Sequence, residues 1–476
     1  MIGTLHTIRD ACDLITSTRV NAETPIKATR NQDGRLESIG DLTVVYDSIS
    51  GHRKGATLGG VAEFIEHNSF GEPVEHRITY NGLEIYSATY EWDSLSRITN
   101  RRERVLGEEG EFVYTYDGRG QLASVTVNGV ATTLYTYDSN GNRTEVVTEG
   151  ASVRSTYNDQ DQMMQQGGAY LLCGLEGEIY EENDQSVGAI RYQYNSFGSM
   201  NAVELPDGTR VEYIFDAAGR RIARSVNGAR TRKYLFDGLL HPVAELDETD
   251  TVVAQYVYAD SHGAPAYISK DEGKYFIASD HLGSPRLVIQ VETGEIVQQL
   301  DYDPWGVVVK DTEPGFQPFG FSGGLYDPLT RLVRCGARDY SASLGRWMQK
   351  DPRGMSSGST NLYAYCENDP VNAVDPTGLT LSNWAKALWA LYLSLQPAIT
   401  PEQVESVYAK WRDQKIQAMR EDEKKRKPRK KDGGGGKDDD DPPGGSCPAE
   451  SPASSAEGAS TGENSEGMVS WAKVGA

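Results

Sequence analysis

The sequence predicts an all-β fold built from repeated hairpins, and three observations support this prediction. Its 476 residues include 50 glycines and 26 tyrosines, which exceeds average usage. An aromatic-x-aromatic pair followed by Asp or Asn recurs along the chain. Asn-Gly pairs, which are typical of tight hairpin turns, follow some of these motifs. Because tyrosine favours strands and glycine permits the positive φ of turns, we expect a long antiparallel β-ribbon.

Taken in order, the first element is residues 1–89, where the repeat pattern is degenerate. The pattern is clearest in residues 90–279, where Asp117 and Asp138 lie 21 residues apart, as do Asp216 and Asp237. Within a repeat the two aromatic side chains share one face of a strand, Asp or Asn starts the turn, and glycine takes the left-handed position. A single hairpin is too small to be stable, so neighbouring hairpins must stack. The repeats include Tyr90-Glu91-Trp92-Asp93, Tyr114-Thr115-Tyr116-Asp117, Tyr135-Thr136-Tyr137-Asp138, Tyr192-Gln193-Tyr194-Asn195, Tyr213-Ile214-Phe215-Asp216 and Tyr234-Leu235-Phe236-Asp237.

Residues 280–379 form a third element with motifs of their own. These are Asp280-His281-Leu282-Gly283-Ser284-Pro285-Arg286, Tyr302-Asp303-Pro304-Trp305-Gly306, Ala337-Arg338-Asp339-Tyr340, Leu344-Gly345-Arg346-Trp347 and Asp375-Pro376-Thr377-Gly378-Leu379. The hairpins resemble the YD, or RHS, repeats of bacterial polymorphic toxins, insecticidal toxin complexes and animal teneurins. The later motifs resemble the RHS repeat-associated core. This resemblance implies a YD-repeat β-ribbon wound into a shell, a core block that seals one end, and a variable C-terminal segment. Because the chain has fewer repeats than members of the family usually have, we expect the shell to be incomplete.

The resemblance also implies a cleavage site at the end of the core. In self-cleaving relatives the chain is cut after the Leu of the Asp-Pro-x-Gly-Leu motif by aspartates assisted by an arginine. Here these residues correspond to Asp351, Asp375 and Arg338, and the bond to Leu379-Thr380. Two carboxylates held close together can share a proton, so that one acts as base toward a water and the other as acid toward the peptide. The alternative is structural, because Asp-Pro commonly starts turns and Arg-Asp pairs commonly stabilise folds.

After the core, the sequence predicts a short helical segment and then a disordered tail. Residues 380–431 carry apolar side chains at helical spacing, including Trp384, Leu388, Trp389 and Tyr392. Residues 432–476 are rich in Gly, Asp, Ser and Glu and contain too little apolar surface to fold. This segment carries no nuclease, deaminase or transferase signature.

Charge and cysteine usage narrow the function classes. The net charge of −22 makes nucleic acid an unexpected partner for the repeat body. The five cysteines form no CxxC pair, and the seven histidines show no metal-ligand spacing, so we expect no metal and no cofactor. No apolar run is long enough to cross a membrane, and no signal peptide is visible. We therefore expect a protein that is cytoplasmic before export and is secreted, or reaches the cell surface, by a non-classical route.

Three functions remain open. The first is an RHS shell-type protein that encloses or presents the C-terminal segment and releases it by self-cleavage in bacterial toxin delivery or intercellular competition. Its expected partners are a second shell-forming chain or a secretion-apparatus component, and an immunity protein. The second is a non-enzymatic surface protein that binds a glycan or a partner chain through exposed aromatic side chains. The third is an inactive, truncated remnant.

Overall fold

The computed structural model describes residues 3–10, 14–259, 263–379 and 382–383. The chain divides into two units, Met1–Asp422 and Glu423–Ala476, and every described residue belongs to the first. The predicted tail at residues 432–476 lies outside the described residues. Of the predicted helical segment 380–431, only Ser382 and Asn383 are described, and they form a short strand.

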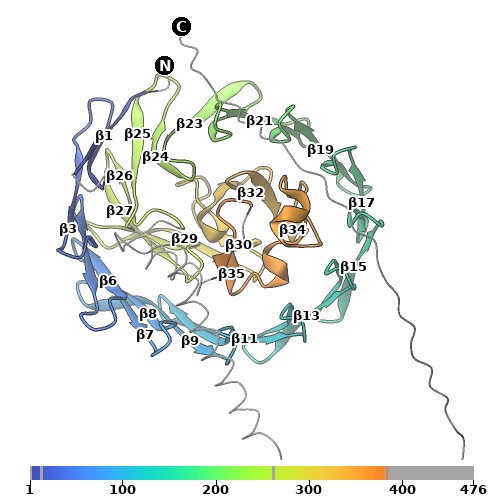
Figure 1. Ribbon diagram of the computed structural model, residues 1–476, viewed down its shortest axis with the longest axis horizontal. Helices are drawn as coiled ribbons and strands as arrows, with labels where there is room; N and C mark the ends of the chain where they lie inside the picture. Colours follow the sequence, from blue (N-terminus) through green and yellow to red (C-terminus); the bar gives the residue numbers. More distant parts are fainter. Residues whose placement is uncertain (1–2, 11–13, 260–262, 380–381, 384–476) are drawn as a thin grey trace, which may run out of the picture. The chain divides into compact units, whose positions relative to one another are not determined.

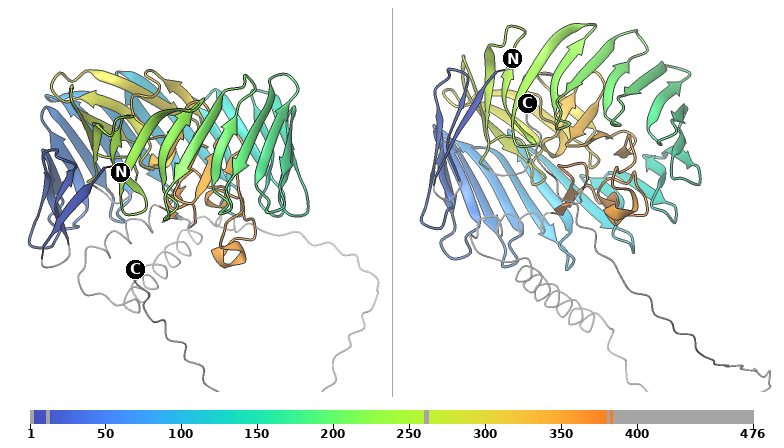
Figure 2. Two further views of the ribbon diagram at one scale, coloured as in Figure 1. Left: turned by 90° about the horizontal axis from the view of Figure 1, so that it is seen from above. Right: turned by 45° about the horizontal axis from the view of Figure 1, so that its top comes forward.

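Thirty strands form one antiparallel ribbon in which each strand pairs with the next along the chain, as predicted. Figure 1 shows the outer strands, from β1 to β23, running around the segments that follow β30, and Figure 2 shows them side by side. Among the described strands no pairing joins β1 to β30, so the sheet is not closed. The strands are β1 (Leu5–Arg9), β2 (Ile15–Val20), β3 (Ile26–Arg30), β4 (Leu36–Ile39), β5 (Leu42–Tyr46), β6 (Arg53–Leu58), β7 (Val61–His67), β8 (Pro73–Tyr80), β9 (Leu83–Trp92), β10 (Ile98–Val105), β11 (Glu108–Tyr116), β12 (Leu122–Val127), β13 (Ala131–Tyr137), β14 (Arg143–Thr148), β15 (Ala151–Tyr157), β16 (Met163–Gln166), β17 (Ala169–Cys173), β18 (Ile179–Asp184), β19 (Gly188–Tyr194), β20 (Met200–Glu204), β21 (Arg210–Phe215), β22 (Arg221–Val226), β23 (Ala229–Asp237), β24 (His241–Leu246), β25 (Val252–Val257), β26 (Tyr267–Lys270), β27 (Gly273–Ser279), β28 (Pro285–Gln290), β29 (Ile296–Tyr302) and β30 (Val308–Asp311).

The repeat motif forms the same turn each time. In the turn after β11, the Asp117 carboxylate accepts hydrogen bonds from the backbone amides of Arg119 at 2.8 Å and Gln121 at 2.9 Å. Asp216 does the same for Ala218 and Arg220. The strand pairing shifts by one residue just before each of these turns, as in a β-bulge. The side chain of Asp thus satisfies the amides that the bulge leaves outside the ladder.

The second aromatic residue of a motif ties its hairpin to the preceding one. The hydroxyl of Tyr116 donates to the Ile98 carbonyl at 2.7 Å, and that of Tyr137 donates to the Leu122 carbonyl at 2.7 Å. Tyr194 makes the equivalent bond to Ile179. The tyrosine ring therefore packs inside the ribbon while its polar end links neighbouring repeats.

The degenerate N-terminal region folds in the same way as the clear repeats. Asn31 accepts hydrogen bonds from the amides of Asp33 and Arg35, and Asn68 accepts them from Phe70 and Glu72. A turn-starting Asn is therefore sufficient for the turn where the aromatic pair is missing.

The ribbon folds back on itself near its C-terminal end. Phe276 and Ala278 of β27 belong to the same hydrophobic cluster as residues of β4 to β13. Tyr275 and Ile277 of the same strand point into another cluster, which contains Phe319. Both faces of β27 are thus covered, which explains why the four consecutive residues Tyr275 to Ala278 are all buried.

The segments after β30 form small elements that pack inside the ribbon (Figure 1). A four-stranded sheet contains β31 (Leu325–Asp327), β32 (Leu332–Cys335), β33 (Arg338–Ser341) and β34 (Arg346–Trp347), and a two-stranded sheet contains β35 (Ala373–Val374) and β36 (Ser382–Asn383). Single 3-10 turns occur at η1 (Phe321–Gly323), η2 (Gly354–Ser357) and η3 (Cys366–Asn368). These elements contact the repeat turns: Asn368 donates to the Gly141 carbonyl at 2.7 Å, Tyr363 to that of Gly177 at 2.8 Å, and Arg346 to that of Asp161 at 2.6 Å.

Candidate functional site

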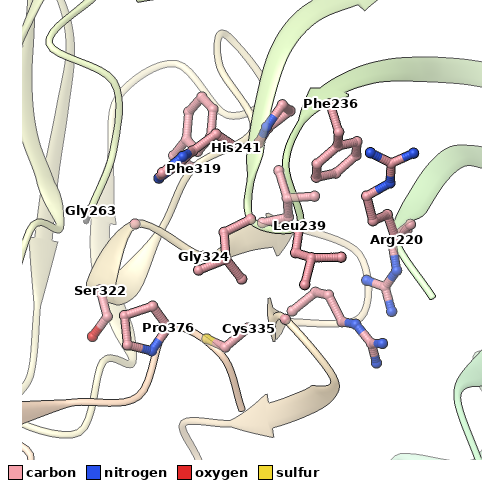
Figure 3. A pocket seen from close by; sticks show the side chains of 17 residues that line it. Arg220, Phe236, Leu239, His241, Gly263, Phe319, Ser322, Gly324, Cys335 and Pro376 are labelled. Carbon is pink, nitrogen blue, oxygen red and sulfur yellow. The ribbon is translucent and has the colours of Figure 1, made fainter. Parts of the chain in front are cut away.

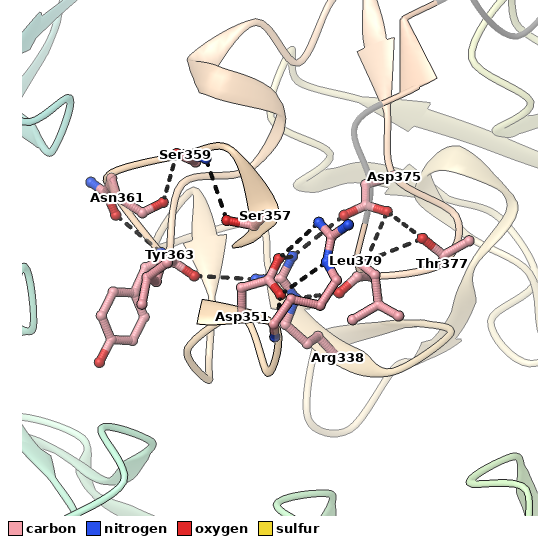
Figure 4. Close-up of polar contacts among 12 residues, drawn as sticks. Arg338, Asp351, Ser357, Ser359, Asn361, Tyr363, Asp375, Thr377 and Leu379 are labelled. Atoms are coloured by element: carbon pink, nitrogen blue, oxygen red, sulfur yellow. Dashed lines mark hydrogen bonds and ion pairs between the residues drawn. The ribbon is translucent and has the colours of Figure 1, made fainter. Parts of the chain in front are cut away.

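The three residues expected to carry the cleavage chemistry lie together inside the core (Figure 4). Arg338 is the first residue of β33, Asp351 follows β34, and Asp375 follows β35. Their exposed fractions are 4%, 6% and 4%. Segments separated by more than ten residues in the sequence thus bring one guanidinium and two carboxylates into a buried site.

Arg338 is the centre of this site. Its Nη2 lies 3.2 Å from Oδ2 of Asp351 and 3.4 Å from Oδ2 of Asp375. Its Nε donates to the Gly378 carbonyl, and its Nη1 donates to the Leu362 carbonyl at 3.2 Å. The indole of Trp347 covers the guanidinium, with the ring centroid 4.2 Å away. One side chain therefore holds both carboxylates and the backbone of the cleavage motif.

The two carboxylates have different further partners. Asp351 Oδ1 accepts from the Arg353 amide at 2.9 Å, and the Arg353 guanidinium lies 3.4 Å from the same oxygen. Asp375 Oδ1 instead accepts from the Thr377 hydroxyl at 2.9 Å and from the Leu379 amide at 3.1 Å. Asp351 thus faces two guanidinium groups, whereas Asp375 contacts the residue before the expected scissile bond. Thr380 lies outside the described residues.

The motif loop is pressed against the hairpin that carries Arg338. Gly378 has φ +63°, and a Cβ built there would lie 2.4 Å from the Cys335 carbonyl oxygen. A Cβ at Gly336 would lie 2.2 Å from the Thr377 carbonyl oxygen, which accepts from the Ala337 amide at 2.9 Å. Both glycines are therefore required by close backbone approach as well as by positive φ.

The electrostatics of the site disfavour either nearby cysteine as the reacting group. Burial raises the pKa of the Cys335 and Cys366 thiols, and the negative charge of Asp375 adds to both shifts. Burial lowers the pKa of Arg338, while Asp351 and Asp375 act in the opposite direction. Among the described residues, no group of three or more His, Cys, Asp or Glu is placed to hold a metal ion.

Other residues noted in the sequence have structural contacts. His281 Nε2 lies 2.8 Å from the Val371 carbonyl, and Asp280 accepts from the amides of Leu282 and Ser284 in a repeat-type turn. Burial lowers the pKa of His281. Sequence reasoning missed Arg353 and Thr377, although both lie two residues after an expected aspartate. The Leu362 carbonyl had no sequence signal, because its place depends on the fold.

Comparison with known proteins agrees with this architecture. The family model of the teneurin YD-shell matches residues 16–371. Teneurin-4 of Mus musculus is 29% identical over 366 residues, which cover 73% of this chain and 13% of the teneurin. Teneurin-m of Drosophila melanogaster is 23% identical over 363 residues, which cover 74% of this chain and 13% of the teneurin. The chain therefore spans about an eighth of the teneurins that it matches.

Two solved structures share the fold. A crystal structure of TcdB2-TccC3-TEV has a TM-score of 0.64 and 18% identity, and the match covers 79% of this chain and 21% of that chain. A Tc holotoxin pore from Photorhabdus luminescens has a TM-score of 0.64 and 16% identity, with the same coverage. No helix among the described residues is long and apolar enough to cross a membrane. Given the ribbon, its repeat turns and the match to residues 16–371, the chain belongs to the teneurin YD-shell family.

Proposed function

We propose that this protein is a shell-type protein that encloses or presents the segment beginning at Thr380 and releases it by one self-cleavage between Leu379 and Thr380. The observation that carries the proposal is the position of Arg338, which contacts Asp351, Asp375 and the Gly378 carbonyl at once. A purely structural ion pair would need only one aspartate beside Arg338. The second aspartate, bonded to the Leu379 amide, is what favours chemistry.

The reaction is a hydrolysis that needs only these groups and water. One carboxylate accepts a proton from a water, and the resulting hydroxide attacks the Leu379 carbonyl carbon. The other carboxyl donates its proton to the Thr380 nitrogen, the C–N bond breaks, and Leu379 keeps a carboxylate. Asp351 suits the base role because two guanidinium groups face it. Arg338 also places positive charge beside the negative charge that develops during the attack.

The wider role follows from the shell. The sheet ends openly at β1 and β30, and the chain corresponds to a minor part of longer relatives. We propose that another shell-forming chain or a component of a secretion apparatus completes the enclosure during bacterial toxin delivery. An immunity protein would then protect the producing cell from the released segment.

A second candidate is a non-enzymatic protein that binds a glycan or partner chain. Exposed aromatic rings favour it: Phe197 is 92% exposed, Phe70 58% and Tyr170 51%. Such rings are common contacts in recognition surfaces. This function requires no cleavage of the chain, so one measurement, whether the purified chain is cleaved, distinguishes the two candidates.

That measurement is the intact mass of the purified full chain over time. Two fragments meeting at Leu379-Thr380 are expected for the wild type. Asp351→Asn and Asp375→Asn should remain whole, Arg338→Ala should be cut slowly or not at all, and Asp207→Asn in an exposed turn should be cut like the wild type. A wild type that stays whole would exclude self-cleavage, and Asp→Asn variants that are still cut at this bond would exclude the two aspartates as the reacting groups.

A further inference from the structure

A small cavity lies on another side of the motif loop and has no part in the proposed cleavage. Its volume is about 50 Å³, and it lies between β22 to β24 and the segments that carry Phe319, Cys335 and Pro376. Figure 3 shows Phe236, Leu239 and Phe319 on one side of the hollow, and Cys335 and Pro376 on the other. Most of its wall is therefore apolar.

The remaining wall carries more positive than negative charge. Arg221 and Arg334 line the cavity and are 4% and 5% exposed. Both pair with the fully buried Asp339: Arg221 Nη2 lies 2.6 Å from Oδ1, and Arg334 Nη1 lies 2.9 Å from Oδ2. Two guanidinium groups thus share one carboxylate. Burial and the charge of Arg221 lower the pKa of Arg334, as expected for a cation that lacks a full counterion.

Both arginines also keep an unused donor. The Nε atoms of Arg221 and Arg334 are buried without a hydrogen-bond partner. The Tyr213 ring lies 3.6 Å from the Arg221 guanidinium, but a ring face is a weaker partner than an anion. None of the described residues that line the cavity is Asp or Glu, and Arg220 is paired with Asp216. Burying a charge without a counterion is costly, so the wall is complementary to an added anion.

We propose that this cavity binds a small carboxylate with a short apolar substituent. A carboxylate would accept hydrogen bonds from the guanidinium groups and balance the surplus charge, as arginine commonly does for carboxylates. The apolar wall of Phe236, Leu239 and Phe319 would hold the substituent. A cavity of this volume holds roughly four to five heavy atoms, which corresponds to acetate or propionate. The proposal does not depend on self-cleavage, because the cavity exists before any cut.

Isothermal calorimetry and thermal unfolding of the full chain test the proposal at constant ionic strength. Propionate should bind at one site and raise the melting temperature saturably relative to chloride. Arg334→Gln removes the surplus charge and should lower propionate affinity at least tenfold. Leu239→Trp, at a lining side chain that is 65% exposed, should block the cavity without loss of the fold. Arg154→Gln, at a surface ion pair, should bind propionate like the wild type.

Three outcomes would overturn the proposal. The first is the absence of saturable propionate heat in the wild type. The second is phosphate binding without propionate binding, which would exclude a carboxylate site of this size. The third is unchanged propionate affinity in Leu239→Trp, a variant that decides the question even if Arg334→Gln fails to fold.

Discussion

At the scale of single residues, arginine is the only side chain that could make all the contacts of Arg338. Its three nitrogens reach two carbonyls and two carboxylates in different directions. A lysine presents one compact ammonium and could not span these acceptors. The planar guanidinium also stacks on Trp347, which keeps water away from one of its faces.

A second residue-scale feature is the hydroxyl that joins neighbouring repeats. Tyr137→Phe removes the bond to the Leu122 carbonyl and keeps the ring, so we expect it to lower the free energy of unfolding by about 1 kcal/mol. Tyr170→Phe is the matched control, because Tyr170 is 51% exposed. Urea unfolding measures the free energy of unfolding of both variants. Equal stabilities would show that the inter-repeat bond contributes nothing.

Burial also shifts the protonation of one carboxyl, that of Asp369, toward neutral pH. Burial raises the pKa of Asp369 to about 7, despite its hydrogen bonds from Asn372. The folded-state pKa of Asp369 therefore lies above its value in the unfolded chain, which is near 4. For this reason the contribution of Asp369 to the free energy of unfolding is complete below about pH 4 and is lost as the pH rises to about 7. Asp303, whose pKa burial raises to about 6, adds a similar dependence.

Unfolding free energies at several pH values between 4 and 8 test this prediction. We expect wild type to lose stability relative to Asp369→Asn as the pH rises, by up to a few kcal/mol. The comparison cancels the contribution of Asp303, which both proteins retain. A difference that stays constant with pH would mean that Asp369 titrates as an ordinary surface carboxyl.

At the scale of elements, the repeat turn depends on one glycine more than on its neighbours. Gly219 has φ +78°, which a β-branched residue tolerates poorly. Gly219→Val should therefore lower the melting temperature clearly more than Ala217→Val in the same exposed turn. Apart from atoms of Gly219 and its two chain neighbours, no atom lies within 4 Å of a Cβ at Gly219, so a difference would report backbone strain. Variants that melt together would refute the assigned turn.

The hairpins were predictable because each is specified locally. The aromatic pair, the Asp and the glycine of Tyr114 to Gly120 are sufficient to specify the strand, the bulge and the turn. The doubly buried β27 was not predictable, because a run of buried residues does not reveal which layers cover it. Arg338, Asp351 and Asp375 were identified only through the family motif. Their contact depends on how β33, β34 and β35 pack, which no local pattern encodes.

At the scale of the whole molecule, the cut should be an event within one chain. Asp375 and the expected scissile bond are only four residues apart, and Asp375 already contacts the Leu379 amide. The rate of cutting after refolding should therefore be the same across a hundredfold range of protein concentration. Fragment formation followed by mass spectrometry measures this rate. A rate that rises with concentration would indicate cleavage between chains.

The contacts between the inner elements and the ribbon also limit how the repeats can vary. Asn368, Arg346 and Tyr363 bond to three successive turns, at Gly141, Asp161 and Gly177. Removing one hairpin pair between these turns would preserve the ribbon but leave an inner side chain opposite the wrong turn. Length changes during evolution should therefore be rejected between Gly141 and Gly177. The repeats in this interval look interchangeable in sequence, but the contacts with the inner elements fix how many of them there can be.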